Sequence, residues 1–377
     1  MNFCRSKSSY LRILHTESSG GWGGQEIRIL TEASGMIARG HQVSILACPD
    51  SNILKEARKL GIPTIELPIF KKKLSYLWAM RQFLKKNAQE FDVINTHSST
   101  DAWLVALAGL FVKETTPVVR TRHISAPINQ NLFTRWLYLR ATNYIVITGE
   151  KLRQILHAEN KYPLDHIVSI PTGIDLLRYH PGNCTTQRAK LGLPERPTLG
   201  IVATLRSWKG HSDLLLVWVK LQRRFVDWQL VICGDGPQRE KLEKQTVELG
   251  IADTVHFIGN CEDIEEWFQA FNLFTLPSYA NEGVPQVLMQ AMASRLPVVS
   301  TSVGAIAEAV LDTKTGYLVA PRQLDKLEDR LACLMSDSSL REKMGDAGYE
   351  YALKHFSCEL MLDAMTIAFK NVLKRRV

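Results

Sequence analysis

Two cations three residues apart, Arg206 and Lys209, follow a short apolar run rich in β-branched residues, 198–203. A sequence of helical length comes next, so both cations are expected at the carboxyl end of a strand and the start of a helix. A fixed pair of cations at such a position can neutralise a departing diphosphate and take the role that a metal ion would otherwise fill. A solvated basic loop is the alternative interpretation of the same spacing.

A carboxylate, Glu282, lies in a loop between the strand-like run 273–276 and a helix predicted to open at Gly283 and Val284. There it can accept hydrogen bonds from sugar hydroxyls, while the helix amides face an anomeric carbon or a phosphate. Gln290 comes two helical turns after Gly283 and is expected near the same face. An ordinary strand–loop–helix corner remains the alternative.

A glycine-rich segment, residues 18–26, stands between the first strand-like run and a helical pattern over 27–38. Glycines such as Gly23 and Gly24 let the backbone come close to a ligand, and a helix N-terminus offers N–H groups to a diphosphate. The segment is not a dehydrogenase fingerprint, because Glu26 occupies the position of the third glycine of GxGxxG. A tight strand–helix turn is the alternative.

The elements that must position these residues form two consecutive series, in which short apolar runs alternate with segments of helical length. The runs of the first series are residues 11–14, 42–47, 64–67, 92–95, 117–120, 144–147 and 167–170, and those of the second are 198–203, 228–233, 254–258, 273–276, 297–300 and 316–319. Each series predicts one doubly wound α/β domain with a parallel sheet, and the boundary falls near residues 175–195. Ligands of such sheets bind at the carboxyl ends of the strands.

Length and composition fit two globular domains: 377 residues, 45% hydrophobic and 22% charged. The sequence contains no apolar run approaching the roughly 18 to 20 residues that span a bilayer. No apolar stretch follows Arg5 and Lys7 before the first strand-like run, which argues against a secretory signal. The seven cysteines are scattered and form no CxxC pair, so we expect a reduced, cytoplasmic protein.

The positive charge lies in the first half of the chain. Residues 1–180 hold 23 Lys and Arg against 14 Asp and Glu, whereas the remainder holds 23 against 24. A basic half suits an anionic partner, such as a phospholipid surface, a phosphorylated glycolipid or a nucleic acid. No basic strand with interleaved aromatic residues and no recognition motif is present, so we expect no nucleic acid.

A helix predicted over residues 71–86 supports a phospholipid surface as the anionic partner. Arg81 and Lys85 share one face with Leu74 and Trp78, and cations around an exposed tryptophan suit an anionic bilayer interface. The opposite stripe, expected to face the core, consists of Tyr76, Leu77, Met80, Phe83 and Leu84. A solvated helix with a half-buried tryptophan is the alternative.

Several motifs occur together in a familiar order, each at a predicted strand–helix junction. They are the glycine-rich segment 18–26, the Thr-Gly-Ile-Asp segment 172–175, Lys-Gly-His at 209–211, the turn 234–237 that starts at Gly234, Phe-Ile-Gly at 257–259 and the block 282–293. In these motifs the sequence resembles the family-4 glycosyltransferases over nearly the whole chain.

The resemblance implies a GT-B fold, in which two Rossmann-like, doubly wound parallel-sheet domains face a cleft. Residues 1–178 would bind the acceptor and residues 179–356 a nucleotide-sugar donor, with the C-terminal helix, 357–377, packing back on the first domain. It also implies transfer with retention of anomeric configuration, with no metal and no cofactor. Consistent with this, the sequence contains no Asp-x-Asp pair.

The resemblance also implies roles for individual donor-binding residues. Lys209 would hold the diphosphate, and Glu282 the sugar hydroxyls with the amides of Gly283 and Val284. The remaining donor-binding positions are Gly23 and Gly24 near the diphosphate, Gly234 in its turn, and Phe257, Ile258 and Gly259 around the base.

Two histidines, His97 and His123, match family residues near the transferred sugar, although a lone histidine is more often structural. Two positions depart from the family pattern. The family usually has a second glutamate, which grips the ribose, where this chain has Gln290. The arginine of the family pattern corresponds to Thr204 in this chain. Arg206, one turn further on, is expected to substitute for it.

The expected reaction moves a hexose-type sugar, from UDP in most of the family, to a glycolipid or surface glycan of the lipopolysaccharide kind. The enzyme would act in the cytoplasm, at the inner face of the membrane. A non-catalytic nucleotide-sugar-binding protein is the alternative, with Gln290 as a sign of decay. A nucleotide-sugar epimerase would lack the block 282–290, and a phosphorylase would be longer and carry a pyridoxal-binding lysine.

Overall fold

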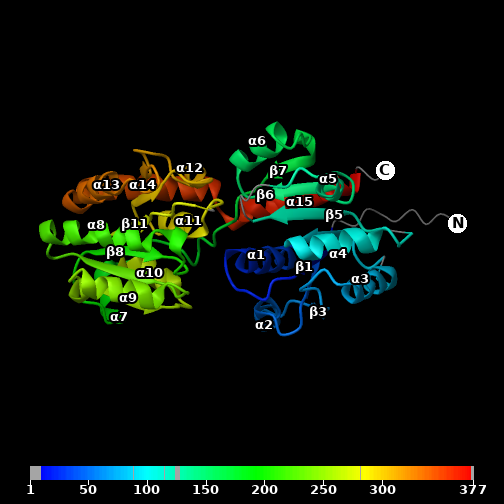
Figure 1. Ribbon diagram of the computed structural model, residues 1–377, viewed down its shortest axis with the longest axis horizontal. Helices are drawn as coiled ribbons and strands as arrows, with labels where there is room; N and C mark the ends of the chain where they lie inside the picture. The colour runs from blue at the N-terminus through cyan, green and yellow to red at the C-terminus, as the bar shows by residue number, and fades with distance from the viewer. Residues whose placement is uncertain (1–9, 88, 114, 124–127, 281, 375–377) are drawn as a thin grey trace. The chain divides into compact units, whose positions relative to one another are not determined.

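The computed structural model of the chain describes residues 10–374 except 88, 114, 124–127 and 281. Arg5, Lys7 and Cys4 therefore lie outside the described residues. The chain divides into two compact units (Figure 1): unit 1 comprises Met1–Gly173 and Cys358–Val377, and unit 2 comprises Ile174–Ser357. Each unit contains one parallel sheet flanked by helices, as the alternating runs predict.

Unit 1 is built on a seven-stranded sheet with the order β3-β2-β1-β4-β5-β6-β7. Its strands are β1 (Arg12–Glu17), β2 (Gln42–Ala47), β3 (Thr64–Glu66), β4 (Val93–Thr96), β5 (Val118–Arg122), β6 (Tyr144–Ile147) and β7 (Ile167–Ser169). Its helices are α1 (Gly24–Ala38), α2 (Asn52–Lys59), α3 (Leu74–Lys86), α4 (Ser99–Gly109), α5 (Leu132–Leu139), α6 (Glu150–Ala158), η1 (Leu164–His166) and α15 (Cys358–Lys374). The strand order reverses between β1 and β4, and ligands of such sheets bind at this switch point.

Alternate residues of each strand in unit 1 enter apolar layers on opposite faces of the sheet. Ile13 and Val93 belong to the layer under α1 and α15, whereas Leu14 and Ile94 belong to the layer under α3 and α4. Helix α15 packs so closely on α1 that a Cβ at Gly35 would lie 2.4 Å from Leu362 Cδ1. The C-terminal helix is thus part of the core of unit 1.

Unit 2 is built on a six-stranded sheet with the order β10-β9-β8-β11-β12-β13. Its strands are β8 (Thr198–Val202), β9 (Gln229–Cys233), β10 (Val255–Gly259), β11 (Leu273–Leu276), β12 (Val298–Thr301) and β13 (Gly316–Val319). Its helices are α7 (Cys184–Lys190), η2 (Ser207–Lys209), α8 (His211–Arg224), α9 (Arg239–Glu248), η3 (Ala252–Thr254), α10 (Ile264–Ala270), α11 (Gln286–Ala293), α12 (Ile306–Ala309), α13 (Leu324–Ser336) and α14 (Ser338–His355). Here the switch point lies between β8 and β11.

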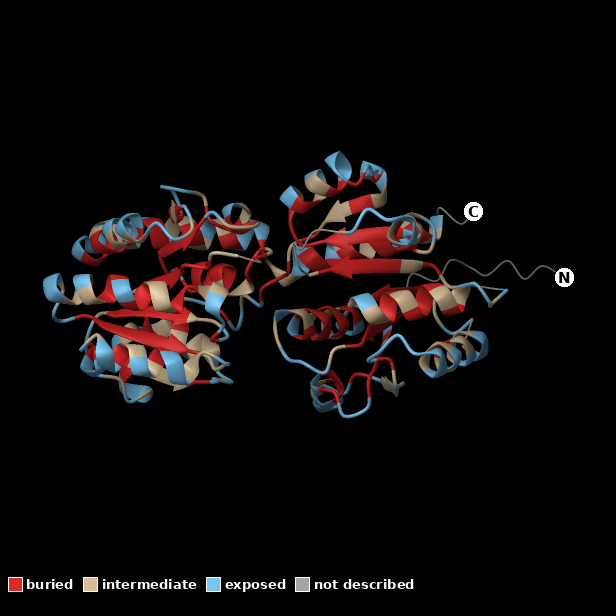
Figure 2. Ribbon diagram, viewed as in Figure 1, coloured by how far each residue is buried: buried red, intermediate tan, exposed pale blue. Residues whose placement is uncertain are grey.

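The same alternation forms the core of unit 2. Leu230 and Ile232 join one apolar layer, and Val231 and Cys233 join the other. In each unit the central strands are buried and the helices expose one face (Figure 2). Both faces of each sheet are covered, which explains why the strands read as continuous apolar runs in the sequence.

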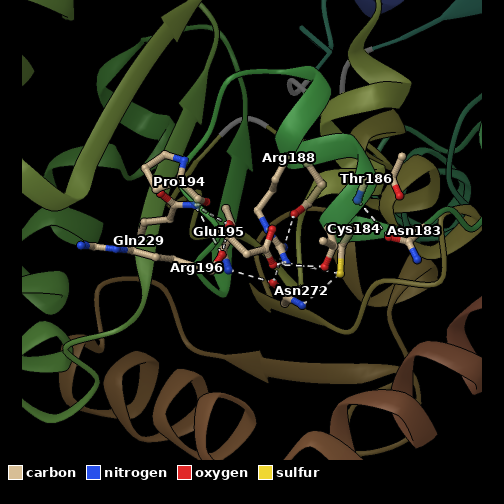
Figure 3. Close-up of polar contacts among 12 residues, drawn as sticks. Asn183, Cys184, Thr186, Arg188, Pro194, Glu195, Arg196, Gln229 and Asn272 are labelled. Atoms are coloured by element: carbon tan, nitrogen blue, oxygen red, sulfur yellow. Dashed lines mark hydrogen bonds and ion pairs between the residues drawn. The ribbon is translucent and has the colours of Figure 1, made fainter.

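Helix α7 is fixed to the rest of unit 2 by one buried cation, Arg188 (Figure 3). Its Nη1 donates to the Ala270 carbonyl and to Asn272 Oδ1, both at 3.0 Å, and its Nη2 lies 2.6 Å from Glu195 Oε1. Asn272 Oδ1 also accepts from the backbone N of Thr198, at the start of β8. This network lies at the amino ends of the strands, away from the edge where ligands bind, and its role is structural.

Helix α3 has the apolar stripe and the exposed Leu74 and Trp78 that the sequence predicts, but Arg81 of the predicted exposed face is half-buried, with its Nε buried. Met80 is fully buried, and the rest of the predicted stripe packs on the same apolar layer. Leu74 and Trp78 are 85% and 62% exposed. Among the helices of the described residues, none combines the length and the apolar character that crossing a membrane requires.

Candidate active site

The loops that follow β8 and β11 meet at the switch point of unit 2. Gly210 has φ 80°, and a Cβ there would lie 2.1 Å from the Pro277 carbonyl oxygen, so only glycine fits. The backbone N of Tyr279 donates to the Trp208 carbonyl at 2.8 Å. These contacts hold the two loops in register with each other.

The contact between these loops carries an ion pair between Lys209 and Glu282. Lys209 Nζ lies 2.7 Å from Glu282 Oε1, and the two side chains are 20% and 7% exposed. A charge-assisted hydrogen bond this short, largely shielded from water, is stronger than an exposed ion pair. The structure therefore joins the cation and the carboxylate that the sequence identified separately.

Arg206 takes no part in this ion pair. Its side chain is exposed, and its guanidinium carbon lies 5.3 Å from the centroid of the Trp208 ring. The two cations of the predicted pair are therefore in different surroundings, with Lys209 on the carboxylate and Arg206 on an aromatic face.

The prediction that a helix opens at Gly283 and Val284 is wrong. Helix α11 begins at Gln286, after Pro285 at the N-cap position with φ −71°. Helical conformation is disfavoured for the residue before a proline, so Val284 lies outside the helix. The amides of Gly283 and Val284 belong to the loop that carries Glu282, and Val284 is buried.

Gln290 lies on α11 and is 8% exposed. Burial raises the pKa of Tyr179 to about 12, and an interaction with the side chain of Gln290 acts in the opposite direction. The carboxamide at this position therefore has a protein partner in Tyr179.

The ends of β9 and β10 lie beside this loop system. The backbone N of Gly234 donates to the Gly259 carbonyl at 2.7 Å, and a Cβ on Gly234 (φ 133°) would lie 2.1 Å from the Ala203 carbonyl oxygen. The register of β10 against β9 shifts between Phe257 and Gly259, which leaves Ile258 in a bulge. Bulges at strand ends free backbone groups for other partners.

Sequence reasoning missed Gly304, which supports the loop of Glu282. Gly304 has φ 58°, and a Cβ there would lie 1.9 Å from the carbonyl oxygen of Glu282. The sequence contains only a weak signal for this role. Gly304 follows the predicted strand 297–300, and a single glycine after a strand is common in loops.

Replacing Gly304 with alanine should push the Glu282 loop out of place and lower kcat/KM for sugar transfer by about a hundredfold, as misplacement by about 1 Å does in other enzymes. Steady-state kinetics of Gly304→Ala measures this. Gly192→Ala is the matched control, since Gly192 also has positive φ (68°) but no heavy atom within 4 Å of its would-be Cβ. Equal effects of the two substitutions would assign the loss to backbone strain alone.

In unit 1, the glycine-rich segment is ordered by Glu17, a second residue that sequence reasoning missed. The carboxylate accepts from the backbone N of Ser19 at 2.6 Å, and also from Gln25 Nε2 and Ser98 Oγ. Burial, followed by the charge of Asp101, raises the pKa of Glu17 to about 7.

Helix α1 begins at Gly24, with Gly23 at its N-cap, three residues before the predicted start. The amides of both glycines therefore lie at the helix N-terminus. The first amides of a helix lie at the positive end of its dipole, a position that favours an anion.

The two predicted histidines come together at the carboxyl ends of β4 and β5. Nδ1 of His97 lies 2.9 Å from Nε2 of His123, and the rings stack with centroids 5.2 Å apart. A third histidine, His15 on β1, was missed: its Nδ1 lies 2.8 Å from Nε2 of His97. Burial is the main cause that lowers the pKa of all three, that of His15 to about 3, so the rings are neutral at pH 7. Within the described residues, no group of three or more His, Cys, Asp or Glu side chains is placed to hold a metal ion.

Solved structures identify the class of protein that this fold defines. The crystal structure of a glycosyltransferase from Rickettsia africae ESF-5 matches with a TM-score of 0.87 at 21% identity, over 97% of this chain and 100% of that one. The crystal structure of Anabaena HepE in complex with UDP matches with a TM-score of 0.84 at 19% identity, over 96% and 100%. The fold is that of the GT-B glycosyltransferases.

Sequence comparison then gives the family. Residues 184–351 match the family Glycosyl transferases group 1, and residues 22–178 match Glycosyltransferase Family 4. The lipopolysaccharide core biosynthesis mannosyltransferase LpcC of Rhizobium leguminosarum bv. viciae is 27% identical over 247 residues, 64% of this chain and 68% of LpcC. The chain belongs to the family-4, group 1 glycosyltransferases, as the motifs predict.

Proposed function

We propose that this glycosyltransferase moves a hexose from a nucleoside-diphosphate sugar to a glycolipid or surface glycan, with retention of configuration and without a metal ion. The observation that carries the proposal is the ion pair of Lys209 and Glu282 at the switch point of unit 2. A cation for the diphosphate and a carboxylate for the sugar hydroxyls lie at the ends of the two central strands. HepE was crystallised with UDP and with UDP-glucose, which supports a uridine donor, and the name of LpcC supports a lipopolysaccharide-type acceptor.

The proposed chemistry depends on stabilising the leaving group. Lys209 exchanges its bond to Glu282 for one to the diphosphate, and Glu282 becomes free to accept hydrogen bonds from the sugar. Arg206, exposed beside Trp208, adds a second cation. As the bond to the diphosphate breaks, the sugar becomes oxocarbenium-like, and the acceptor hydroxyl attacks from the same face and gives its proton to the departing phosphate oxygen.

The other residues complete donor and acceptor binding in this proposal. In unit 2, the bulge at Ile258 with Phe257, Gly259 and Gly234 frames the base, and Gln290 must leave Tyr179 to reach the ribose. In unit 1, the helix amides of Gly23 and Gly24 bind phosphate oxygens, and His97 and His123 contact the sugar.

A panel of nucleoside-diphosphate sugars, monitored by release of the nucleoside diphosphate, tests the function directly. We expect one hexose donor to be turned over slowly in water and faster with a glycolipid acceptor, at the same rate with and without EDTA. If the protein binds these donors but hydrolyses none of them, it is a binding protein and not an enzyme. If EDTA abolishes turnover and Mg²⁺ restores it, the reaction depends on a metal ion.

We further propose that the exposed face of α3 rests on anionic lipid at the cytoplasmic side of the membrane. Leu74, Trp78 and Lys85 are exposed on this helix, and apolar side chains near a cation suit the bilayer interface. Flotation with vesicles containing phosphatidylglycerol should recover the wild type at low salt and much less Trp78→Ala. Flotation of the two proteins to the same extent would remove α3 from the proposal.

A further inference from the structure

Three imidazoles form a continuous hydrogen-bonded chain inside unit 1. Nδ1 of His15 lies 2.8 Å from Nε2 of His97, and Nδ1 of His97 lies 2.9 Å from Nε2 of His123. The rings stack, with centroids 5.1 and 5.2 Å apart. His15 is fully buried and His97 is 3% exposed, whereas His123 is partly exposed. The chain therefore runs from the core of the unit to its surface.

The buried end of the chain meets a carboxylate, Glu32 on α1. Nε2 of His15 lies 3.9 Å from Glu32 Oε1, and Nε of Arg28 lies 3.9 Å from Glu32 Oε2. All three side chains are fully buried, and these nitrogens and Glu32 Oε2 have no hydrogen-bond partner within 3.5 Å among the described residues. Asn95 Nδ2 donates to Glu32 Oε1 at 3.5 Å. Glu32 is thus the carboxylate that lies beside the buried end of the histidine chain.

A neutral imidazole donates with one nitrogen and accepts with the other. The proton on one ring of the chain therefore determines the tautomer of the next. If ionised Glu32 accepts from Nε2–H of His15, then Nδ1 of His15 accepts from Nε2–H of His97, and Nδ1 of His97 accepts from Nε2–H of His123. Nδ1 of His123 is then unprotonated, and it makes no hydrogen bond to any described residue.

We propose that Glu32 and His15 are positioning residues that fix the Nε2–H tautomer of His97 and His123, so that Nδ1 of His123 accepts a hydrogen bond from a substrate hydroxyl. This inference rests on the proposed function for the identity of the substrate, but the tautomers themselves are a property of the free protein. Protonation of Glu32 reverses the chain: the acid donates to Nε2 of His15, and each ring then carries its proton on Nδ1.

Burial restricts the ionised form of Glu32 to neutral pH and above. Burial raises the pKa of Glu32 to about 7, and the charge of Arg28 opposes this rise. The other charged groups that face the chain are Arg120 on β5 and Asp101 on α4, whose Oδ2 accepts from the backbone N of His97 at 3.0 Å. Because the folded-state pKa is raised, the accepting form of His123 is complete above about pH 8 and is lost as the pH falls through 7.

Nitrogen-15 NMR of the donor-free protein, labelled at histidine, tests the tautomers directly. Ring nitrogens with and without a proton have distinct shifts, and His123→Gln assigns the signals of His123. At pH 8 we expect unprotonated Nδ1 and protonated Nε2 in all three rings, with a reversal as the pH falls below 7. A proton on Nδ1 of His123 at pH 8, or a pattern that does not change with pH, overturns the proposal.

Variants then connect the tautomers to transfer. Glu32→Gln does not titrate, so the NMR reversal should disappear and kcat/KM should fall less below pH 7 than in the wild type, since Glu17 still titrates near pH 7. His15→Phe breaks the chain and should lower kcat/KM for transfer about ten- to a hundredfold at pH 8, the range found for residues that orient a ligand group from behind. Glu56→Gln, an acid-to-amide change on α2 outside the cluster, is the control and should match the wild type in both readouts.

If the tautomers reverse as expected and no donor is turned over, the proposed function fails and the tautomer assignment stands. A pH profile of Glu32→Gln identical to that of the wild type overturns the role in transfer.

Discussion

Lys209→Ala is expected to lower the rate of sugar transfer by about 100- to 1,000-fold, the usual loss when one preorganised donor to a developing anion is removed. In the donor-free chain the ammonium of Lys209 is held 2.7 Å from Glu282 by two loops that contact each other through Gly210. The cation is therefore held at the end of the strand before the donor binds, and the diphosphate replaces Glu282 as its partner. Single-turnover kinetics with saturating donor measures the chemical step, and a titration with nucleoside diphosphate should show weaker binding as well.

Two further variants separate the catalytic loss from a structural one. Removing Lys209 leaves the nearly buried carboxylate of Glu282 without its cation, which destabilises the fold by itself. The double variant Lys209→Ala/Glu282→Ala removes both charges, and it should recover thermal stability without recovering transfer. Lys220→Ala, a lysine-to-alanine change on exposed α8 surface, should leave transfer unchanged. Turnover near that of the wild type in Lys209→Ala would show that the diphosphate is neutralised elsewhere.

The arrangement of the fold could be predicted from the sequence because both faces of each sheet are covered. Strands buried on both faces read as short continuous apolar runs, and residues 42–47, 144–147, 273–276 and 316–319 coincide with β2, β6, β11 and β13. Where an observed helix boundary differs from the predicted one, a residue at the boundary explains the difference. The helix after Glu282 starts late because Pro285 disfavours helical conformation at Val284, and the signal for this was present in the sequence.

The contacts within the candidate site could be predicted only in part. The positions of Lys209 and Glu282 at the ends of strands follow from the sequence, but their contact depends on β8 and β11 being neighbours in the sheet. His15 gave no signal, because a single histidine in an apolar run is common in cores. Its role becomes visible only once β1 and β4 pair, with Leu14 opposite Ile94, and bring it beside His97.

Glu282→Ala is expected to reduce transfer about 100- to 1,000-fold, as Lys209→Ala does, but to act oppositely on binding of the nucleoside diphosphate. In the proposed mechanism Glu282 binds the sugar and not the diphosphate. In the free protein, however, it competes with the diphosphate for Lys209, because the two side chains are ion-paired. Removing the carboxylate releases the cation, and the affinity for UDP should therefore be kept or increased while the chemical step is lost. Isothermal titration with UDP, together with single-turnover transfer, measures both quantities on the same preparation.

The conservative variant Glu282→Gln tests which property of the carboxylate matters. An amide still accepts one hydrogen bond from a sugar hydroxyl but cannot form an ion pair, so UDP binding should resemble that of Glu282→Ala while transfer falls less. If the charge served only to hold Lys209 in place, both variants would lose UDP affinity together with transfer, as Lys209→Ala does. That result, or transfer in Glu282→Ala within about threefold of the wild type, would remove Glu282 from sugar binding. The sign of the change in UDP affinity therefore decides whether the ion pair is a resting state that the donor opens or a fixed part of the scaffold.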